Sequence, residues 1–328
     1  MKVLITGATG FTGGYLARRM VSLGHQVRAL VRNENAIAEL ESEGIETVVG
    51  ELTSPSDVKM AVKDCDQVFH LAAVFRTAGH SDRHYMKINL GGTQNILEAA
   101  RQHGCERVVH CSTGGVHGHV ARPPANEDSP IAPGDIYQRS KVAAEKAVFS
   151  EIKAGLPALI VRPGAIYGEG DRRFLKLFHF IQRGRFLMIG RGTTRLHLIH
   201  IDDLVDGLVL CGRPSSPVGN AFLMAGPEAP TLWEIVRSVS RILKVPEPRL
   251  SVPVWPVWLA GGLCEMLCRP LGIDPPLHRR RVSFFTHHRE FDISRARSLL
   301  DFNPSITVDH GLERTIQWSV REGLLSTP

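Results

Sequence analysis

The sequence predicts an α/β protein whose core is a parallel, doubly wound sheet with helices on both faces. Three observations predict this fold class. The chain opens on a short apolar run that leads into a glycine-rich turn, short apolar runs then alternate with helical patterns, and the alternation weakens past Pro163. Each crossover helix returns the chain to the same strand direction, so alternation of this kind indicates parallel strands.

The glycine-rich turn follows the first predicted strand. Residues 1–6 are mostly apolar, Gly7, Gly10 and Gly13 follow at the spacing Gly-x-x-Gly-x-x-Gly, and a second apolar run lies at 27–31. Glycines let the backbone bend sharply and approach a pyrophosphate closely, while the amides that open the next helix face the anion. Between a strand and a helix, this motif predicts a dinucleotide site in a Rossmann-type sheet.

The alternation defines the elements expected in the first half. The expected strands are residues 3–5, 27–31, 46–49, 67–71, 107–111 and 158–162. The expected helices are residues 15–23, 35–41, 55–62, 90–102 and 136–153. Ligands of such sheets lie at the carboxyl ends of the strands, so we expect the functional site at that edge.

The second half favours a smaller lobe that closes over the cofactor, because prolines and glycines become frequent past Pro163. We expect residues 1–162, joined by about 198–226, to form the dinucleotide-binding Rossmann domain. Residues 163–197 and 227–328 are expected to form a C-terminal substrate-binding lobe.

The composition is that of a soluble globular protein, and it argues against some classes of partner and ligand. Of 328 residues, 43% are apolar and 22% charged, and the formal net charge is +6. No long basic run with interleaved aromatic residues is present, so we expect no nucleic-acid partner. The six cysteines are scattered and no export signal precedes the first strand, which predicts reduced thiols in the cytoplasm. The histidine pairs lack further ligands at recognised spacing, so no metal site is expected.

The most apolar stretch, residues 252–263, contains two prolines and is shorter than the roughly twenty residues that span a bilayer. It includes Trp255 and Trp258, and Arg269 and the arginines at 279–281 follow it. An interfacial helix is one reading. We favour core packing or an apolar substrate entrance over membrane contact.

A tyrosine and a lysine lie four residues apart at Tyr137 and Lys141. Residues at this spacing share one face of a helix, so the phenol and the ammonium project together. A nearby cation favours the phenolate and lowers the tyrosine pKa, which suits Tyr137 to general acid or base chemistry. Of the four tyrosines, Tyr137 alone has a lysine four residues later.

Further motifs accompany this pair, in order, along nearly the whole chain. They are Thr6-Gly-Ala-Thr-Gly-Phe-Thr-Gly13, His70-Leu-Ala-Ala73, Asn89-Leu-Gly-Gly-Thr93, Cys111-Ser-Thr113, Arg162-Pro-Gly-Ala-Ile-Tyr-Gly168, His200-Ile-Asp-Asp203 and Phe291-Asp-Ile-Ser-Arg-Ala296. Together they resemble the extended branch of the short-chain dehydrogenase/reductase superfamily, in the NAD-dependent epimerase/dehydratase family. The segments 275–282, 291–296 and 311–318 look like the ends of 3β-hydroxysteroid dehydrogenase-like and dihydroflavonol reductase-like proteins.

The resemblance implies roles for individual residues. Tyr137 is the expected catalytic acid/base, and Lys141 both tunes it and binds the nicotinamide ribose. Thr113 is the expected hydroxyl partner of the substrate oxygen, and Ser112 is the neighbour that shares or replaces that role. The expected cofactor-binding residues are Gly7, Thr9, Gly10, Phe11, Thr12, Gly13, Arg32, Glu51, Leu52, Leu71, Ala72, Ala73, Tyr137, Lys141, Pro163, Ala165 and Ile166.

The end of the second strand bears on cofactor choice. Enzymes that use NAD usually place an acidic residue there for the ribose hydroxyls, whereas NADP requires a cation for the 2′-phosphate. Here Val31 stands where the acid is expected and Arg32 follows, which favours NADP over NAD. Glu51 occupies the place of an aspartate that lies beside the adenine in relatives.

The resemblance leaves two reactions open. Gly114-Gly115 replaces the Asp-Glu pair of sugar dehydratases, so elimination is disfavoured. The favoured reading is an NAD(P)-dependent oxidoreductase that interconverts a secondary alcohol and a ketone on an apolar or alicyclic small molecule. The alternative is a nucleotide-sugar 4-epimerase, although Leu196 stands where such enzymes carry an arginine, with Arg195 one place away. A homodimer through the helices at 90–102 and 136–153 is expected by resemblance.

Overall fold

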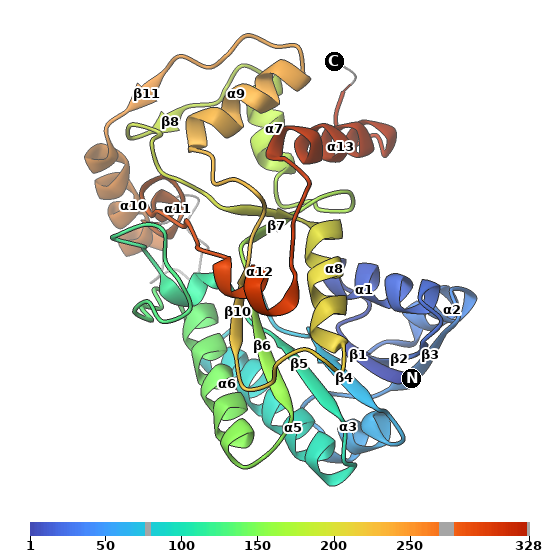
Figure 1. Cartoon of the computed structure of the whole chain (residues 1–328). Helices are drawn as coiled ribbons and strands as arrows, with labels where there is room; N and C mark the ends of the chain where they lie inside the picture. The colour runs from blue at the N-terminus through green and yellow to red at the C-terminus, as the bar shows by residue number, and fades with distance from the viewer. Residues whose placement is uncertain (76–79, 269–278, 327–328) are drawn as a thin grey trace.

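The computed structural model describes residues 1–75, 80–268 and 279–326. Arg269 and the start of the 275–282 motif lie outside the described residues. A seven-stranded parallel sheet forms one half of the molecule (Figure 1). Its strands are β1 (Lys2–Thr6), β2 (Gln26–Val31), β3 (Ile45–Val49), β4 (Gln67–His70), β5 (Arg107–Cys111), β6 (Ala158–Pro163) and β10 (Ala221–Met224), in the order β10-β6-β5-β4-β1-β2-β3. This order confirms the predicted Rossmann-type fold class.

Helices cover both faces of the sheet because each strand buries apolar side chains on both sides. On one face α3 (Pro55–Val62), α5 (Gly92–Gln102) and α6 (Ile136–Lys153) share a core. On the other lie α1 (Phe11–Ser22), α2 (Ile37–Ser42) and α8 (Ile201–Gly212). Short helical turns complete this part at η1 (Glu34–Ala36), α4 (Asp82–Tyr85), the π-helical η2 (Met86–Gly91) and η3 (Gly114–His117).

The expected helix bounds hold where a capping side chain marks the start. Ser54 caps α3, with Pro55 at its first position, and Asp135 caps α6 by accepting from the Gln138 amide at 2.8 Å. Helix α1 instead begins at Phe11, four residues before the expected start. Its N-cap is Gly10, which has no side chain that could mark the start in the sequence.

A second group of elements has its own hydrophobic core, which includes Phe178, Leu232 and Leu312. Its helices are α7 (Leu175–Gln182), α9 (Leu232–Ile242), α10 (Val254–Cys268), α11 (Arg279–Thr286) and α13 (Val308–Arg321). Strand β7 (Ala165–Tyr167) pairs with β9 (Leu198–His200), and β8 (Met188–Ile189) pairs with β11 (Ser251–Val252). Helix α12 (Ser294–Leu300) packs against β10 and α8. We call α7, α9, α10, α11, α13 and the β8–β11 pair the second lobe; the residue bounds of two domains stay a prediction.

The apolar stretch forms most of α10, and core packing is the wrong interpretation of it. Trp255 is 67% exposed, Trp258 46% and Leu263 57%, and Gly261 is the buried residue of the helix. Figure 1 shows α10 and α11 at the side of the second lobe, away from the sheet. Among the described helices, none is both long and apolar enough to cross a membrane.

Candidate active site

The predicted site residues gather at the carboxyl edge of the sheet. The glycine turn follows β1, Leu71 follows β4, Ser112 and Thr113 follow β5, and Pro163 ends β6. Because the strands are parallel, these segments share one edge, where ligands of doubly wound sheets bind.

The glycine turn leaves no room for side chains. A Cβ at Gly13 would lie 2.1 Å from the Gly7 carbonyl oxygen, and one at Gly7, whose φ is +80°, would lie 2.9 Å from the Ala72 amide nitrogen. The Gly10 amide donates to the Gly7 oxygen at 2.9 Å, which closes the turn. With no side chain capping α1, its first amides point to the edge of the sheet, and this turn fits a dinucleotide pyrophosphate.

Lys141 is almost fully buried on α6, one turn after Tyr137. Its Nζ donates to the Cys111 carbonyl at 2.6 Å and lies 3.4 Å from His110 Nε2. Burial lowers the pKa of Lys141 below its ordinary value. These contacts fix the ammonium at the end of β5, beside Ser112 and on the same helix as Tyr137.

Two histidines beneath this lysine were not predicted as site residues. His70 and His110 pair in register on β4 and β5, with ring centroids 5.3 Å apart. Burial, followed by the nearby Lys141 charge, lowers the pKa of His70 to about 3 and that of His110 well below its ordinary value. Both rings are therefore neutral at neutral pH, so Lys141 lies beside two uncharged bases.

His70 begins a chain of buried hydrogen bonds. Thr93 donates its proton to the Asn89 carbonyl at 2.6 Å, so its oxygen accepts from His70 Nε2 at 2.9 Å. His70 Nδ1 then accepts from Thr6 Oγ1 at 2.8 Å. These partners fix the neutral tautomer of His70 that carries its proton on Nε2. Through its two hydrogen bonds, the ring joins β1 to α5.

The chain continues through Asn89 to the backbone of Tyr137. Asn89 accepts from the Val74 amide at 2.7 Å, donates to the Val74 carbonyl at 3.1 Å and donates to Ser140 Oγ at 2.9 Å. Ser140 Oγ in turn donates to the Tyr137 carbonyl at 2.7 Å. The start of α6 is thereby tied to the loop after β4. The motif around Asn89 indicated family likeness but not this role.

Ser112 and Thr113 have different surroundings. Ser112 is buried, and its hydroxyl finds no hydrogen-bond partner among the described residues. Thr113 is partly exposed, and its oxygen accepts from the Gly115 amide at 3.0 Å, which caps η3. The Thr113 hydroxyl can therefore still donate a hydrogen bond to a ligand, whereas the Ser112 side chain is buried in the protein.

The residues expected beside the adenine follow the next strands. Arg32 lies one residue past β2 and Glu51 lies two residues past β3, and both are exposed. The Gly50 amide donates to the Val31 carbonyl at 2.9 Å, which holds these two strand ends together. Leu52 is buried beside them. The structure thus brings Arg32 and Glu51 to one end of the edge and Tyr137 to the other.

Arg173 bridges the two ends of the site and was not predicted. Its guanidinium carbon lies 5.7 Å from the Phe11 ring centroid and 5.9 Å from that of Phe75. Phe75 packs edge-on against Tyr137 at 4.9 Å between centroids. Arg173 also donates to the Ile166 carbonyl at 2.8 Å, beside the segment expected to contact the nicotinamide. Aromatic rings and one cation therefore line the path from the glycine turn to Tyr137.

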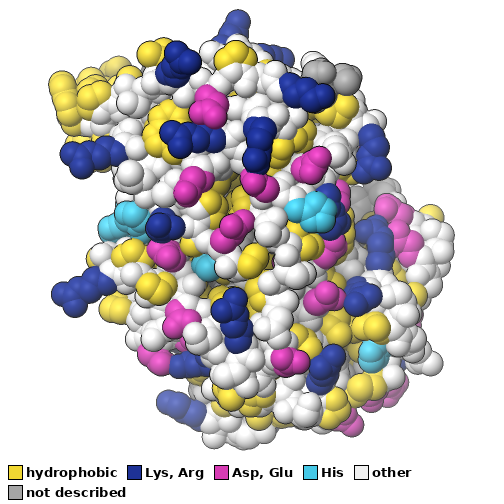
Figure 2. Space-filling model, turned by 45° about the horizontal axis from the view of Figure 1, so that its top comes forward, with side chains coloured by type: hydrophobic (Ala, Val, Ile, Leu, Met, Phe, Trp, Pro, Cys, Tyr) yellow, Lys and Arg dark blue, Asp and Glu magenta, His cyan; other side chains and the backbone are white. Residues whose placement is uncertain are grey.

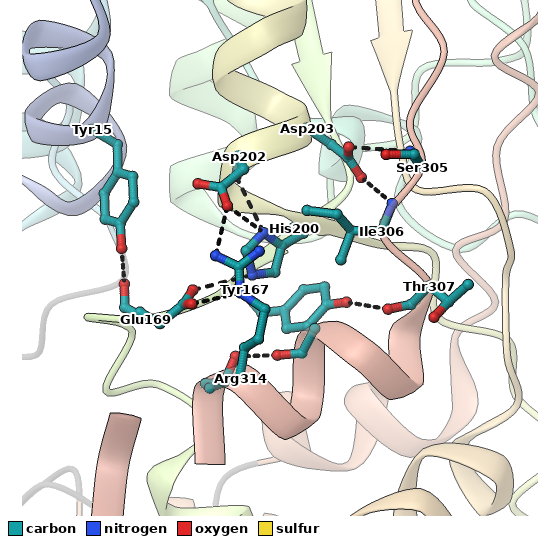
Figure 3. Close-up of polar contacts among 12 residues, drawn as sticks. Tyr15, Tyr167, Glu169, His200, Asp202, Asp203, Ser305, Ile306, Thr307 and Arg314 are labelled. Atoms are coloured by element: carbon teal, nitrogen blue, oxygen red, sulfur yellow. Dashed lines mark hydrogen bonds and ion pairs between the residues drawn. The ribbon is translucent and has the colours of Figure 1, made fainter. Parts of the chain in front are cut away.

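Glu169 connects α1, which packs on the sheet, to α13 (Figure 3). Its carbonyl accepts from the Tyr15 hydroxyl at 2.9 Å, and its carboxylate accepts from Arg314 at 2.7 Å and lies 3.2 Å from His200 Nε2. Arg314 also donates to Asp202 at 2.7 Å. Burial alone would raise the pKa of Glu169, but the contacts with His200, its own backbone and Arg314 lower it to about 2. We call Tyr15, Glu169, His200, Asp202 and Arg314 the bridging network.

Comparison with known proteins agrees with this geometry. The model of the NAD dependent epimerase/dehydratase family matches residues 3–223. The chain is 29% identical over 326 residues to 2-alkyl-3-oxoalkanoate reductase of Stenotrophomonas maltophilia, covering 96% of this chain and 98% of that protein. It is 27% identical to 3 beta-hydroxysteroid dehydrogenase/Delta 5→4-isomerase of Mycobacterium tuberculosis, covering 97% and 90%.

Among solved structures, the UDP-glucuronic acid 4-epimerase from Bacillus cereus in complex with NAD superposes with a TM-score of 0.79 at 21% identity, over 99% of this chain and 100% of that one. That likeness extends the shared fold to both lobes. The family match, the full-length relatives and the motifs agree with one another. The chain therefore belongs to the NAD-dependent epimerase/dehydratase family and is an NAD(P)-dependent enzyme of the extended short-chain dehydrogenase/reductase superfamily.

Proposed function

We propose that the protein is an NADP-preferring oxidoreductase that interconverts a secondary alcohol and a ketone on an apolar or alicyclic small molecule. The observation that carries the proposal is the placement of Tyr137, Lys141 and Thr113 at one edge, with the Phe75 ring against Tyr137. When bound, the nicotinamide supplies or accepts the hydride at the substrate carbon. The full-length likeness to proteins named as reductase and dehydrogenase supports the same class.

The protein's own residues handle the proton and the substrate oxygen. Tyr137 passes a proton to or from that oxygen. The partly exposed Thr113 hydroxyl donates a hydrogen bond to the same oxygen. Lys141, anchored on the Cys111 carbonyl, places a positive charge near the phenol and favours its ionised form. The hydrogen bonds from Asn89 to Ser140 and from Ser140 to the Tyr137 carbonyl fix the backbone of Tyr137 at the edge of the sheet.

Two observations weigh against the reactions of nucleotide sugars. A Cβ at Gly114 would lie 2.7 Å from the Phe291 ring, so the acidic side chain of a dehydratase has no space there. Leu196 is buried, and Arg195 donates to the Ala229 carbonyl at 2.7 Å and pairs with Glu290 at 3.6 Å. Position 196 therefore has no cation, and the cation at position 195 is already engaged, so a nucleotide diphosphate would lack its usual partner. A 4-epimerase is for this reason the second candidate.

The preference for NADP is supported by Arg32, which is exposed one residue past β2, and by the valine at position 31, where enzymes that use NAD carry an acidic residue. A homodimer through α5 and α6 belongs to the same proposal and rests on the resemblance of the sequence. The proposal of a cytoplasmic location rests on the scattered cysteines.

A comparison of wild type with Tyr137→Phe tests the proposal. Purified protein is denatured to identify any retained nucleotide, and NADPH-dependent reduction of a panel of cyclic and aliphatic ketones is then measured. We expect an empty or exchangeable site, tighter binding of NADPH than NADH, and a loss of about 10²–10⁴-fold in kcat for Tyr137→Phe. NADPH affinity of the variant serves as the folding control. Tightly retained NAD with interconversion of sugar epimers would instead favour the epimerase.

A further inference from the structure

Helix α10 presents an unusually apolar surface. Trp255, Leu263, Met266 and Leu267 are each between 57% and 67% exposed, and at 3.6 residues per turn they fall within about 120° of one another around the helix. Figure 2 shows hydrophobic side chains gathered in a projecting group at its upper left, on the side where α10 lies in Figure 1. A contiguous group of this kind usually marks a contact with a protein or a membrane.

The apolar surface continues onto the neighbouring strand pair. The Met188 amide donates to the Leu250 carbonyl at 3.1 Å, where β8 pairs with β11 just before α10 begins. Leu250 is 71% exposed, and the adjacent Leu187 is 42% exposed. We call α10 together with Leu187 and Leu250 the apolar edge of the second lobe.

Arginines are frequent in the segments that form and flank this edge. Residues 172–201, which include α7 and β8, carry seven Arg or Lys and no Asp or Glu. Residues 248–289, which include β11, α10 and α11, carry six Arg against two acidic residues. Within these segments, Arg173 pairs with Asp171 and Arg195 pairs with Glu290, which lie just outside them. Arg183, Arg185, Arg191 and Arg249 are all exposed.

We propose that the apolar edge docks onto the surface of an anionic lipid bilayer. The fifteen residues of α10 rise roughly 22 Å, short of the roughly 30 Å hydrocarbon layer, so the helix lies in the interface rather than across it. Tryptophan favours that depth, and the surrounding arginines face the lipid phosphates. This inference does not depend on the reaction proposed above.

Vesicle flotation and tryptophan fluorescence test it. The full chain is mixed with vesicles of phosphatidylcholine alone, or of phosphatidylcholine and phosphatidylglycerol in equal parts. We expect flotation with the anionic vesicles that weakens in high salt. A Trp233→Phe/Trp318→Phe variant leaves Trp255 and Trp258 as its tryptophans, and we expect brominated lipid to quench their emission.

Paired variants distinguish this surface from general stickiness. Trp255→Ser/Leu263→Ser is expected to lower vesicle binding at least tenfold, and Arg185→Glu/Arg249→Glu to lower it at least tenfold on anionic vesicles. The matched control, Met60→Ser/Leu299→Ser, alters residues that are 58% and 48% exposed on other elements and is expected to bind as wild type. The absence of flotation would overturn the proposal. So would a concentration-dependent dimer that Trp255→Ser/Leu263→Ser abolishes, because a second copy would then cover this edge.

Discussion

Ser112 and Thr113 are adjacent hydroxyls with opposite environments. Thr113 caps η3 and stays partly exposed, while the Ser112 hydroxyl is buried with no hydrogen-bond partner in the described structure. A buried hydroxyl without a partner costs free energy, so its removal is nearly neutral or slightly stabilising. We therefore propose the substrate-facing role for Thr113, the residue favoured by the sequence.

We expect Thr113→Ala to lower kcat by about 10- to 100-fold, since it removes the hydrogen bond to the reacting oxygen. Loss of the cap would cost about 1 kcal/mol of stability as well. Thr113→Ser keeps both functions and is the matched control. Ser112→Ala is expected to retain kcat and the melting temperature. Steady-state kinetics and thermal unfolding measure these effects. Loss of activity in Ser112→Ala but not in Thr113→Ala would give the role to Ser112 instead.

At the scale of the element, the glycine turn and α1 act as one rigid unit. Gly13 lies in the first turn of α1, against the Gly7 carbonyl, so the backbone itself would form the floor of the proposed dinucleotide site. Gly91 offers a matched control, because its φ of −62° is helical and no atom lies within 4 Å of an added Cβ.

Gly13→Ala is expected to abolish measurable NADPH binding and to lower stability, because its Cβ would overlap a backbone oxygen that has no room to move. Gly91→Ala should stabilise the protein by about 0.5–1 kcal/mol through its better helix propensity. Fluorescence titration with NADPH and thermal unfolding measure both effects. Normal affinity in Gly13→Ala would show that the turn has another role.

At the scale of the whole molecule, the bridging network ties the sheet to the second lobe through Glu169 (Figure 3). The pKa of Glu169 in the folded state is about 2, below its ordinary value of 4.5. A carboxylate with a lowered pKa contributes stability that is fully present above about pH 4.5 and is lost as the pH falls toward 2.

Glu169→Gln is expected to lower the free energy of unfolding at pH 6 by roughly 1–3 kcal/mol and to flatten its decline in acid. Urea unfolding at pH 6 and pH 3.5 measures this difference. Glu39→Gln, at a side chain that is 72% exposed, controls for the loss of one charge. Equal acid sensitivity of wild type and Glu169→Gln would mean that the network contributes nothing to the joining of the lobes.

Much of the fold could be predicted from the sequence, because each strand and the helix that follows it are recognisable from their own stretch of residues. The helices at 55–62 and 136–153 have the bounds that the sequence predicted, and the chemistry of Tyr137 and Lys141 stays a proposal. The pairing of His70 with His110 depends on the register between strands forty residues apart, which no local pattern encodes. Likewise, the apolar composition of α10 did not reveal that its side chains face outward, since burial depends on what packs against them.

The exposed arginines beside α10 also make the charge distribution of the molecule uneven, with a positive end at the apolar edge. A dipole near a charged surface experiences a torque before any contact is made, within a range of about 8 Å at physiological salt. The protein would therefore arrive at an anionic surface already turned, with α10 leading and the sheet trailing. Orientation would then be set during approach, and only the depth of docking would depend on the tryptophans.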